Sequence, residues 1–172
     1  VPEAAQLLNK WHQAFSIDFV EAPVPVFPLA NMRDLRQRVG VSFCANEGLW
    51  TAADAYRVIR SRCADVLCFS GYWVGTLRRF HTLCQVAHLE GLAVCKHTHG
   101  ELGIAAAAAH HVLLAIPNAC DGAQQTAAMM ADDILQTPLP IASTACWGRV
   151  DGPGLGIDVD EEKIATYAEL YR

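Results

Sequence analysis

The feature that most constrains the fold is a series of polar residues, each placed where an apolar, strand-like segment ends. Strand-like segments alternate with segments of helical, amphipathic spacing, and the links between them are short. Such alternation predicts parallel strands joined by right-handed helical crossovers. The polar residues recur roughly every 25 residues, the length of one β/α unit. They are Glu21, Glu47, Ser70, His99 and Asp121.

The same pattern predicts where the individual elements lie. We expect strands within residues 17–25, 41–48, 65–70, 92–99 and 118–122. We expect helices within residues 3–15, 31–40, 51–63, 74–91 and 103–117. Asn31 and Thr51 are the expected N-caps of the second and third helices, because short polar side chains accept hydrogen bonds from the first helical N–H groups.

Two architectures share this alternation, and the polar strand ends favour one of them. In a (β/α) barrel the carboxyl ends of all strands lie on one rim, where active sites are assembled. A doubly wound open sheet does not need a polar residue at one strand end after another, so the sequence favours an α/β fold of the barrel type. Five strands are fewer than the eight of a closed barrel, so this interpretation predicts about three further β/α units before Val1.

Composition excludes several classes of protein. Hydrophobic residues make up 52% of the 172 residues and charged residues 18%, which is typical of a heavily buried architecture. A net charge of −5 leaves no basic face for nucleic acid, and no apolar run is long enough to span a membrane. The seven cysteines contain no C-x-x-C pair, so we interpret them as small core residues of a cytoplasmic protein rather than as a disulfide framework or a zinc ribbon.

The residue types at the strand ends indicate proton-transfer chemistry. Glu21 and Glu47, on neighbouring strands, suit Mg²⁺, which prefers oxygen ligands, and a nearby histidine suits proton transfer near neutral pH. Strand alternation predicts His97 and His99 on one face, with His99 at the rim and His97 one layer deeper, while Lys96 points to the other face. Together these groups could remove a proton next to a carboxylate, with the metal stabilising the developing enolate.

Other interpretations of the same residues stay open. Glu21 also suits a solvent-exposed strand end, and Glu47 lies in a sequence that is common in turns. The pair His97 and His99 is also a ligand arrangement of zinc-dependent, amidohydrolase-like barrels. A third possibility is a truncated barrel without catalytic activity.

Four stretches of the sequence give a family resemblance. They are "IDFVEAPVP", "ANEGLWTAADAYRVIRSRCADVLCFSGYWVGTLRRF", "HTHGELGIAAAA" and "DGPGLGIDVDEEKIATY". In type and order they resemble the enolase superfamily, in particular the mandelate racemase/muconate lactonizing enzyme family. The resemblance implies a modified (β/α) barrel in which acidic residues at three successive strand ends hold Mg²⁺. Glu21 matches the second ligand and Glu47 the third, and the first would precede Val1.

The resemblance also implies a domain division and a set of site residues. Residues 1–138 would supply strands four to eight of the barrel, and residues 139–172 would return toward a capping domain. His99 matches the histidine at the end of strand seven, with His97 as the competing alignment. Ser70 stands where an aspartate usually supports that histidine, and Asp121 is the nearest acid to the substrate-binding position of strand eight. The lysine of lactonizing members at strand six has no counterpart in "CFSGYW".

We therefore expect Mg²⁺-dependent abstraction of the α-proton of a small carboxylate substrate. The overall reaction would be dehydration of a hydroxy or sugar acid, or racemisation or epimerisation. We expect a cytoplasmic homo-oligomer as the parent protein, and weak Mg²⁺ binding with little activity for the isolated chain.

Overall fold

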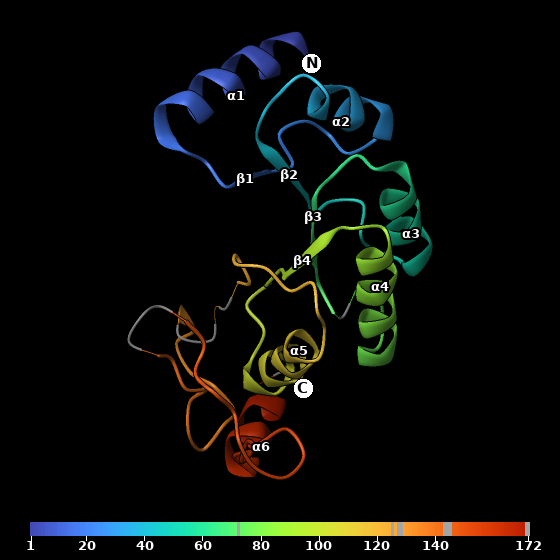
Figure 1. The fold of residues 1–172 in the computed structure, drawn as a ribbon. Coiled ribbons are helices and arrows are strands. Elements are labelled where there is room, and N and C mark those ends of the chain that lie inside the picture. Colours follow the sequence, from blue (N-terminus) through green and yellow to red (C-terminus); the bar gives the residue numbers. More distant parts are fainter. Residues whose placement is uncertain (72, 125, 127–128, 143–145, 171–172) are drawn as a thin grey trace. The chain divides into compact units, whose positions relative to one another are not determined.

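The computed structural model describes residues 1–71, 73–124, 126, 129–142 and 146–170. Helices and strands alternate through most of the chain, as the sequence predicts (Figure 1). The elements are α1 (Pro2–Phe15), β1 (Phe19–Glu21), α2 (Leu29–Arg36), β2 (Ser42–Ala45), α3 (Ala52–Ser61), β3 (Val66–Phe69), α4 (Leu77–Leu89), β4 (Ala93–Lys96), α5 (Gly103–Leu114) and α6 (Glu161–Glu169).

The chain forms two compact units, each built from two separate stretches. Unit 1 contains Val1–His97 and Ala115–Ala123, and unit 2 contains Thr98–Leu114 and Gln124–Arg172. Unit 1 therefore holds the whole sheet, whereas unit 2 holds α5, α6 and the irregular segments between them.

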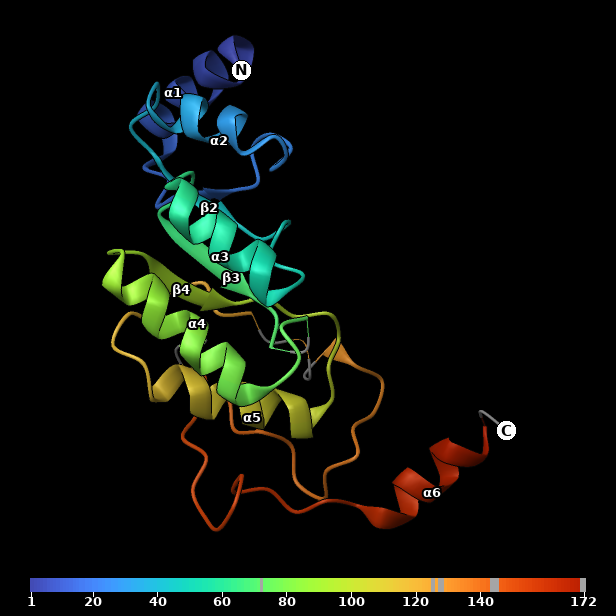
Figure 2. The same cartoon turned by 90° about the vertical axis from the view of Figure 1, so that its right-hand side faces the viewer.

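The sheet of unit 1 has four parallel strands in the order β1-β2-β3-β4, with helices α2, α3 and α4 along one side (Figures 1 and 2). The fifth predicted strand pairs with β4 through a single parallel bridge between Ala119 and Val94. Backbone hydrogen bonds on either side of that bridge join Val94 to Asn118 and to Cys120, at 2.8 and 2.9 Å. All pairs of strands in this sheet are parallel, which confirms the α/β architecture with crossover helices.

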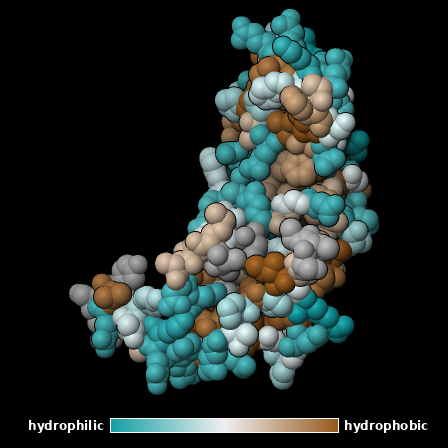
Figure 3. Space-filling model, turned by 90° about the vertical axis from the view of Figure 1, so that its left-hand side faces the viewer, coloured by the Kyte–Doolittle hydropathy of each residue, from teal (hydrophilic) through white to brown (hydrophobic). Residues whose placement is uncertain are grey.

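Residues on the two faces of the sheet have different surroundings. On the helix side, Phe69 of β3 packs edge-on against Phe80 of α4, with ring centroids 5.8 Å apart. On the other face a cluster of buried residues, Cys44, Val66, Cys68 and Cys95, packs against partly buried neighbours, Phe19, Ala93 and Cys120. Figure 3 views unit 1 from the side away from α2–α4, where patches of hydrophobic residues lie among hydrophilic ones.

One of the two predicted helix caps is confirmed and the other is wrong. Thr51 Oγ1 accepts a hydrogen bond from Asp54 N at 3.1 Å, as an N-cap does. Asn31 lies inside α2 instead, because the helix begins at Leu29 after Pro28 as N-cap. The Asn31 N–H donates to Pro28 O at 2.9 Å, which places the asparagine in the first turn of the helix.

Unit 2 is organised around α5. Asp133 accepts from Gly103 N with both carboxylate oxygens, at 2.9 and 3.1 Å, and so satisfies an N–H at the start of this helix. His111 lies 3.1 Å from Leu155 O through Nε2. Short antiparallel bridges join Leu135 to Val159 and Ile141 to Trp147. None of the described helices combines the length and the apolar character that crossing a membrane requires.

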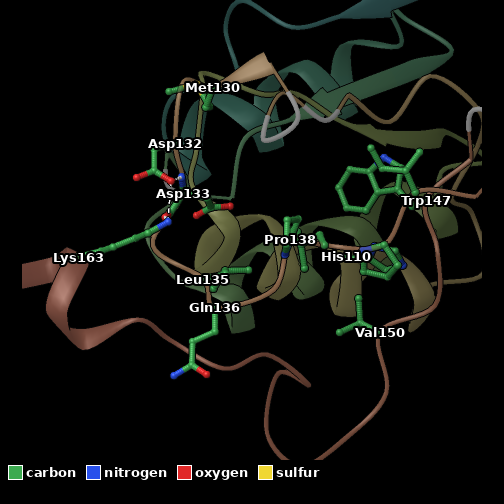
Figure 4. A pocket seen from close by; sticks show the side chains of 13 residues that line it. His110, Met130, Asp132, Asp133, Leu135, Gln136, Pro138, Trp147, Val150 and Lys163 are labelled. Carbon is green, nitrogen blue, oxygen red and sulfur yellow. Dashed lines mark hydrogen bonds and ion pairs between the residues drawn. The ribbon is translucent and has the colours of Figure 1, made fainter.

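A cavity of about 410 Å³ lies within unit 2 (Figure 4). His110 and Trp147 form part of its wall, with ring centroids 4.6 Å apart. On its polar side Lys163 Nζ donates to Asp132 at 2.7 Å. None of the six site residues that the sequence predicts lines this cavity.

Candidate functional site

The carboxyl ends of the parallel strands place several polar residues of unit 1 at one edge of the sheet. Glu21 is the last residue of β1, and Asn46 follows β2 directly. Ser70 follows β3 and His97 follows β4 in the same way. The His97 N–H donates to Phe69 O at 2.8 Å, so this residue continues the pairing with β3 by one hydrogen bond. We call this group the strand-end cluster: Glu21, Asn46, Glu47, Ser70 and His97.

Asn46 joins two of the predicted site residues, although the sequence did not single it out. Its Nδ2 lies 2.8 Å from Glu21 Oε1 and 3.1 Å from His97 Nδ1. The side chain is buried, with 5% of its surface exposed. Strand alternation contained a signal for this residue, because Asn46 comes two positions after Cys44, which faces the same side of the sheet.

The Asn46 amide determines which nitrogen of a neutral His97 ring carries the proton. The amide NH₂ group faces Glu21, because the amide oxygen would be repelled by the carboxylate. The second amide N–H is then directed at His97 Nδ1, which must accept it. A neutral His97 ring therefore carries its proton on Nε2.

Burial keeps His97 predominantly neutral. Loss of solvation lowers the pKa of His97 below its ordinary value, and the positive charge of Lys96 acts in the same direction. The carboxylates of Glu21 and Glu47 oppose the effect but do not overcome it. Both carboxylates therefore lie near enough to act on this imidazole. The Trp73 ring stacks on His97 with centroids 5.5 Å apart and planes 21° apart.

Lys96 lies on the opposite face of the sheet, as strand alternation predicts. It pairs in register with Phe69, the residue that contacts α4. The lysine is buried, and loss of solvation lowers the pKa of its ammonium group to about 8.

Two buried polar atoms at the strand ends have no hydrogen-bond partner among the described residues. They are Ser70 Oγ and Asn46 Oδ1. Leaving a buried polar atom unpaired costs roughly 1–3 kcal/mol, so such atoms mark places where a bound group can restore the lost interaction. Oxygen atoms of this kind, together with the carboxylates of Glu21 and Glu47, match the ligand preference of Mg²⁺. The residues present therefore fit a hard cation.

The other predicted residues lie in different surroundings. Glu47 is exposed beside Asn46, and Asp121 is exposed just after the segment that pairs with β4. His99 is exposed and belongs to unit 2, where its N–H donates to Glu101 Oε2 at 3.0 Å. Thr98 bonds to the same carboxylate through its hydroxyl group.

The predicted extent of the fourth strand is wrong. It was expected to reach His99, but β4 ends at Lys96. After His97 the backbone N–H groups bond to side chains instead, as that of Thr98 does to Gln124 Oε1 at 3.3 Å. Alternation therefore cannot place His97 one layer below His99, and His97 itself lies at the strand end.

Comparisons with known proteins agree with this architecture. The family model described as enolase C-terminal domain-like matches residues 1–163. A chloromuconate cycloisomerase of Pseudomonas putida is 30% identical over 160 residues, which cover 90% of this chain and 42% of that protein. Muconate cycloisomerase 1 of Rhodococcus opacus is 28% identical, with 88% of this chain and 40% of that protein covered. A probable glucarate dehydratase of Streptomyces coelicolor is 26% identical, with 87% and 34% covered.

Solved structures give the same result. The crystal structure of an isomerase from Streptomyces coelicolor superposes with a TM-score of 0.84 at 26% identity, covering 98% of this chain and 45% of that one. The muconate lactonizing enzyme of Pseudomonas putida has a TM-score of 0.86 at 20% identity, covering 96% and 46%, and at this identity it supports the fold alone. The chain thus spans about two fifths of the length of these curated relatives. It belongs to the enolase superfamily, as a C-terminal domain of the mandelate racemase/muconate lactonizing enzyme type.

Proposed function

We propose that the intact protein abstracts the α-proton of a small carboxylate substrate with the assistance of Mg²⁺. The observation that carries this proposal is the contact of one buried amide, Asn46, with the Glu21 carboxylate and the His97 imidazole at the carboxyl ends of three parallel strands of one sheet. Glu47 adds a second carboxylate near the same imidazole. A hard-cation site beside a neutral histidine is a combination that suits enolate chemistry.

Each residue of the cluster has a distinct role in this proposal. Glu21 and Glu47 hold Mg²⁺, which when bound offsets the negative charge that develops on the substrate. Asn46 orients both Glu21 and His97. His97 donates a hydrogen bond from Nε2 to an oxygen of the substrate, as a neutral imidazole can.

Three further residues are assigned from the sequence. His99, two residues further along the chain, is the predicted base that takes the α-proton. Ser70 and Asp121 are the predicted substrate contacts. We further propose that residues 139–172 return toward a capping domain, as the family resemblance implies.

For the overall reaction we favour dehydration of a hydroxy or sugar acid, or racemisation or epimerisation. Curated relatives include both cycloisomerases and a probable glucarate dehydratase, at 24–30% identity. The sequence that follows β3, "SGYW", has no lysine in the position where lactonizing members carry one. Dehydration also needs an acid that protonates the departing hydroxyl, and His99 can serve this purpose once it has taken the α-proton.

The test is solvent exchange at the α-carbon. The intact protein is incubated with Mg²⁺ in D₂O, together with a panel of hydroxy, sugar and amino acid carboxylates, and deuterium incorporation is followed by NMR. We expect exchange with at least one acid, its loss in His99→Asn, and a 2-keto acid or an inverted stereoisomer as product. Failure of every acid to exchange, together with Zn²⁺-dependent hydrolysis of amides or esters, would support the amidohydrolase-like alternative. No reaction of any kind would support a non-catalytic protein.

A further inference from the structure

Three buried thiols meet in the interior of unit 1, on the face of the sheet that points away from α2–α4. Cys44, Cys68 and Cys95 come from β2, β3 and β4, which lie side by side in the sheet (Figure 1). Their sulfur atoms all lie within 4.8 Å of one another. All three residues are buried, with at most 1% of their surface exposed. Among the described residues, no other group of three histidine, cysteine or acidic side chains converges in this way.

Strand register explains the convergence. Cys68 and Cys95 are direct partners in the β3–β4 pairing, and Cys44 pairs with Val66, two positions before Cys68 on the same face. Phe19 and Ala93 pack against the group and complete an apolar surround. The sulfur atoms are therefore held by backbone hydrogen bonds of the sheet and do not depend on flexible loops.

The three thiols already interact as a set. Hydrogen bonds from Cys44 and Cys95 lower the pKa of the Cys68 thiol to about 5, and the positive charge of Lys96 acts in the same direction. The same contacts raise the pKa of Cys44. A cation that takes the place of these thiol protons would find its sulfur ligands already assembled.

We propose that Cys44, Cys68 and Cys95 form a binding site for a soft, thiophilic cation, of the Cu⁺ or Zn²⁺ class, separate from the strand-end cluster. Thiolate ligands select such ions over Mg²⁺. A zinc–sulfur bond of about 2.3 Å places tetrahedral sulfur ligands about 3.8 Å apart, a spacing that the observed grouping permits. Binding replaces the thiol protons, which are released to solvent, and involves no change of oxidation state.

Cys120 decides between the two ions. It packs against the cluster that contains the three thiols, and it is only partly buried. Cu⁺ can be bound by three sulfur ligands, whereas Zn²⁺ takes four ligands in structural sites. Participation of Cys120 would therefore make the site tetrahedral.

The test uses the reduced, intact protein under anaerobic conditions. Cd²⁺ is added as a probe for Zn²⁺, and sulfur-to-cadmium charge transfer is followed by ultraviolet absorption. Cu⁺ is added in a second titration, in competition with a coloured Cu⁺ chelator. We expect one equivalent of at least one of the two ions to bind per chain, and Cys68→Ala to weaken that binding by about tenfold or more. Cys95→Ser provides a second variant in case the first fails to fold.

Matched controls make the result specific. Cys84→Ala removes a buried thiol of α4 outside the group, Cys146→Ser removes an exposed thiol, and Glu47→Gln alters the strand-end cluster. All three are expected to leave the titration unchanged. Loss of Cd²⁺ binding in Cys120→Ser assigns a four-sulfur site, and retained Cu⁺ binding in the same variant assigns a three-sulfur site. Binding that persists in both Cys68→Ala and Cys95→Ser, or that disappears in Cys146→Ser, or an absence of stoichiometric binding of either ion, would overturn the proposal.

Discussion

The orientation of a single amide determines much of the chemistry at the strand ends. Asn46 has two N–H groups, and each has an acceptor: Glu21 at 2.8 Å and His97 at 3.1 Å. An imidazole that accepts at Nδ1 carries its proton on Nε2, so the amide favours the neutral ring over the imidazolium ion. Asn46 is thus a positioning residue for both the proposed metal ligand, Glu21, and the proposed hydrogen-bond donor to the substrate, His97.

Replacing this amide by a carboxylate should reverse its effect on the ring. In Asn46→Asp the new carboxylate accepts from His97 Nδ1–H and stabilises the imidazolium ion, so we expect the pKa of His97 to rise. NMR titration of the His97 ring, assigned with His97→Gln, measures the change. Asn31→Asp, inside α2, is the control and should leave this pKa where it is. An unchanged His97 pKa in Asn46→Asp would contradict the hydrogen bond as described.

The pH dependence of exchange follows from the same ring. The pKa of His97 is lowered from 6.5, mainly by loss of solvation, and the ring is neutral above its pKa. Protonation would place a positive charge beside the proposed Mg²⁺ ligand Glu21 and so weaken Mg²⁺ binding. We therefore expect the rate of α-proton exchange, at a limiting Mg²⁺ concentration, to fall as the pH drops through this lowered pKa, that is, below pH 6.5. In Asn46→Asp the fall should begin at a higher pH. If the wild type and Asn46→Asp had identical pH–rate profiles, protonation of His97 would not be the cause of the fall in exchange rate at low pH.

The sequence predicted some of the individual site residues and missed others. Strand ends predicted Glu21, Glu47 and Ser70, and the structure places these three at one edge of the sheet. The end of the fourth strand was assigned to His99, whereas the structure has His97 there. Asn46 was not identified as a site residue from the sequence, because the neighbouring Glu47 is the more obvious metal ligand. Its contact with His97 joins residues 51 positions apart, and such a contact depends on the pairing of three strands.

Among the secondary-structure elements, α2 and the sheet are held together by one carboxylate. Asp65 accepts from Arg36 Nε at 2.9 Å and from Phe43 N at 2.9 Å, so it links the helix to β2. Burial alone would raise the pKa of Asp65, but the Arg36 guanidinium and the Phe43 amide lower it below the usual value. The folded protein therefore favours the ionised form.

Removing this charge should destabilise the fold. We expect Asp65→Asn to reduce the free energy of unfolding by about 1–2 kcal/mol, because the backbone N–H loses a charged acceptor while the Arg36 side chain is partly solvated. Urea denaturation at neutral pH measures this loss. Asp34→Asn, which breaks an exposed pair with Arg38, is the control and should cost only about 0.3–0.5 kcal/mol.

The pH dependence of the same contribution has a definite sign. Because the folded pKa of Asp65 lies below the unfolded value of about 3.9, the stabilisation is present above that value and is lost as the pH falls through the folded pKa. The stability difference between the wild type and Asp65→Asn should therefore shrink in acid. A difference that grows in acid would contradict this account.

The start of α5 depends on a glycine. A Cβ atom at Gly103 would overlap the side chain of Leu135 and lie 2.9 Å from Asp133 Oδ2. We expect Gly103→Ala to reduce the free energy of unfolding by about 1–3 kcal/mol through overpacking. Gly40→Ala is the matched control, because the nearest atom to its Cβ, in His12, is 4.0 Å away. Equal stability of the two variants, measured by denaturation, would show that the start of α5 can shift without cost.

The elements themselves were largely predictable, and their ends were not. Apolar runs and short links indicated the four strands and the order of the helices. The end of β4 was misplaced because the alternation in "CKHTH" continues past the last backbone pairing, where Thr98 bonds to side chains of Glu101 and Gln124 instead. Helix α6 was recognised only as part of a motif, although its N-cap Asp160 and the acidic residues after it form a recognisable start signal.

For the molecule as a whole, family membership rests on a match that extends over residues 1–163 and on the same order of strands and helices in solved structures. The predicted division at residue 138 stays a prediction. The cysteines show what cannot be predicted without the register of strand pairing. They were interpreted as core residues, and Cys44, Cys68 and Cys95 are indeed buried. That three of them converge depends on which residues of β2, β3 and β4 lie side by side.

The central claim is that the strand-end cluster supports α-proton abstraction, and the exchange rate in one pair of variants tests it most directly. The acid that exchanges fastest in the substrate panel is incubated in D₂O with Mg²⁺ and the intact protein carrying either Glu47→Gln or Glu3→Gln, an exposed substitution in α1. We predict that Glu47→Gln lowers the exchange rate by about a hundredfold or more, whereas Glu3→Gln leaves it unchanged. Exchange at the wild-type rate in Glu47→Gln would contradict the account.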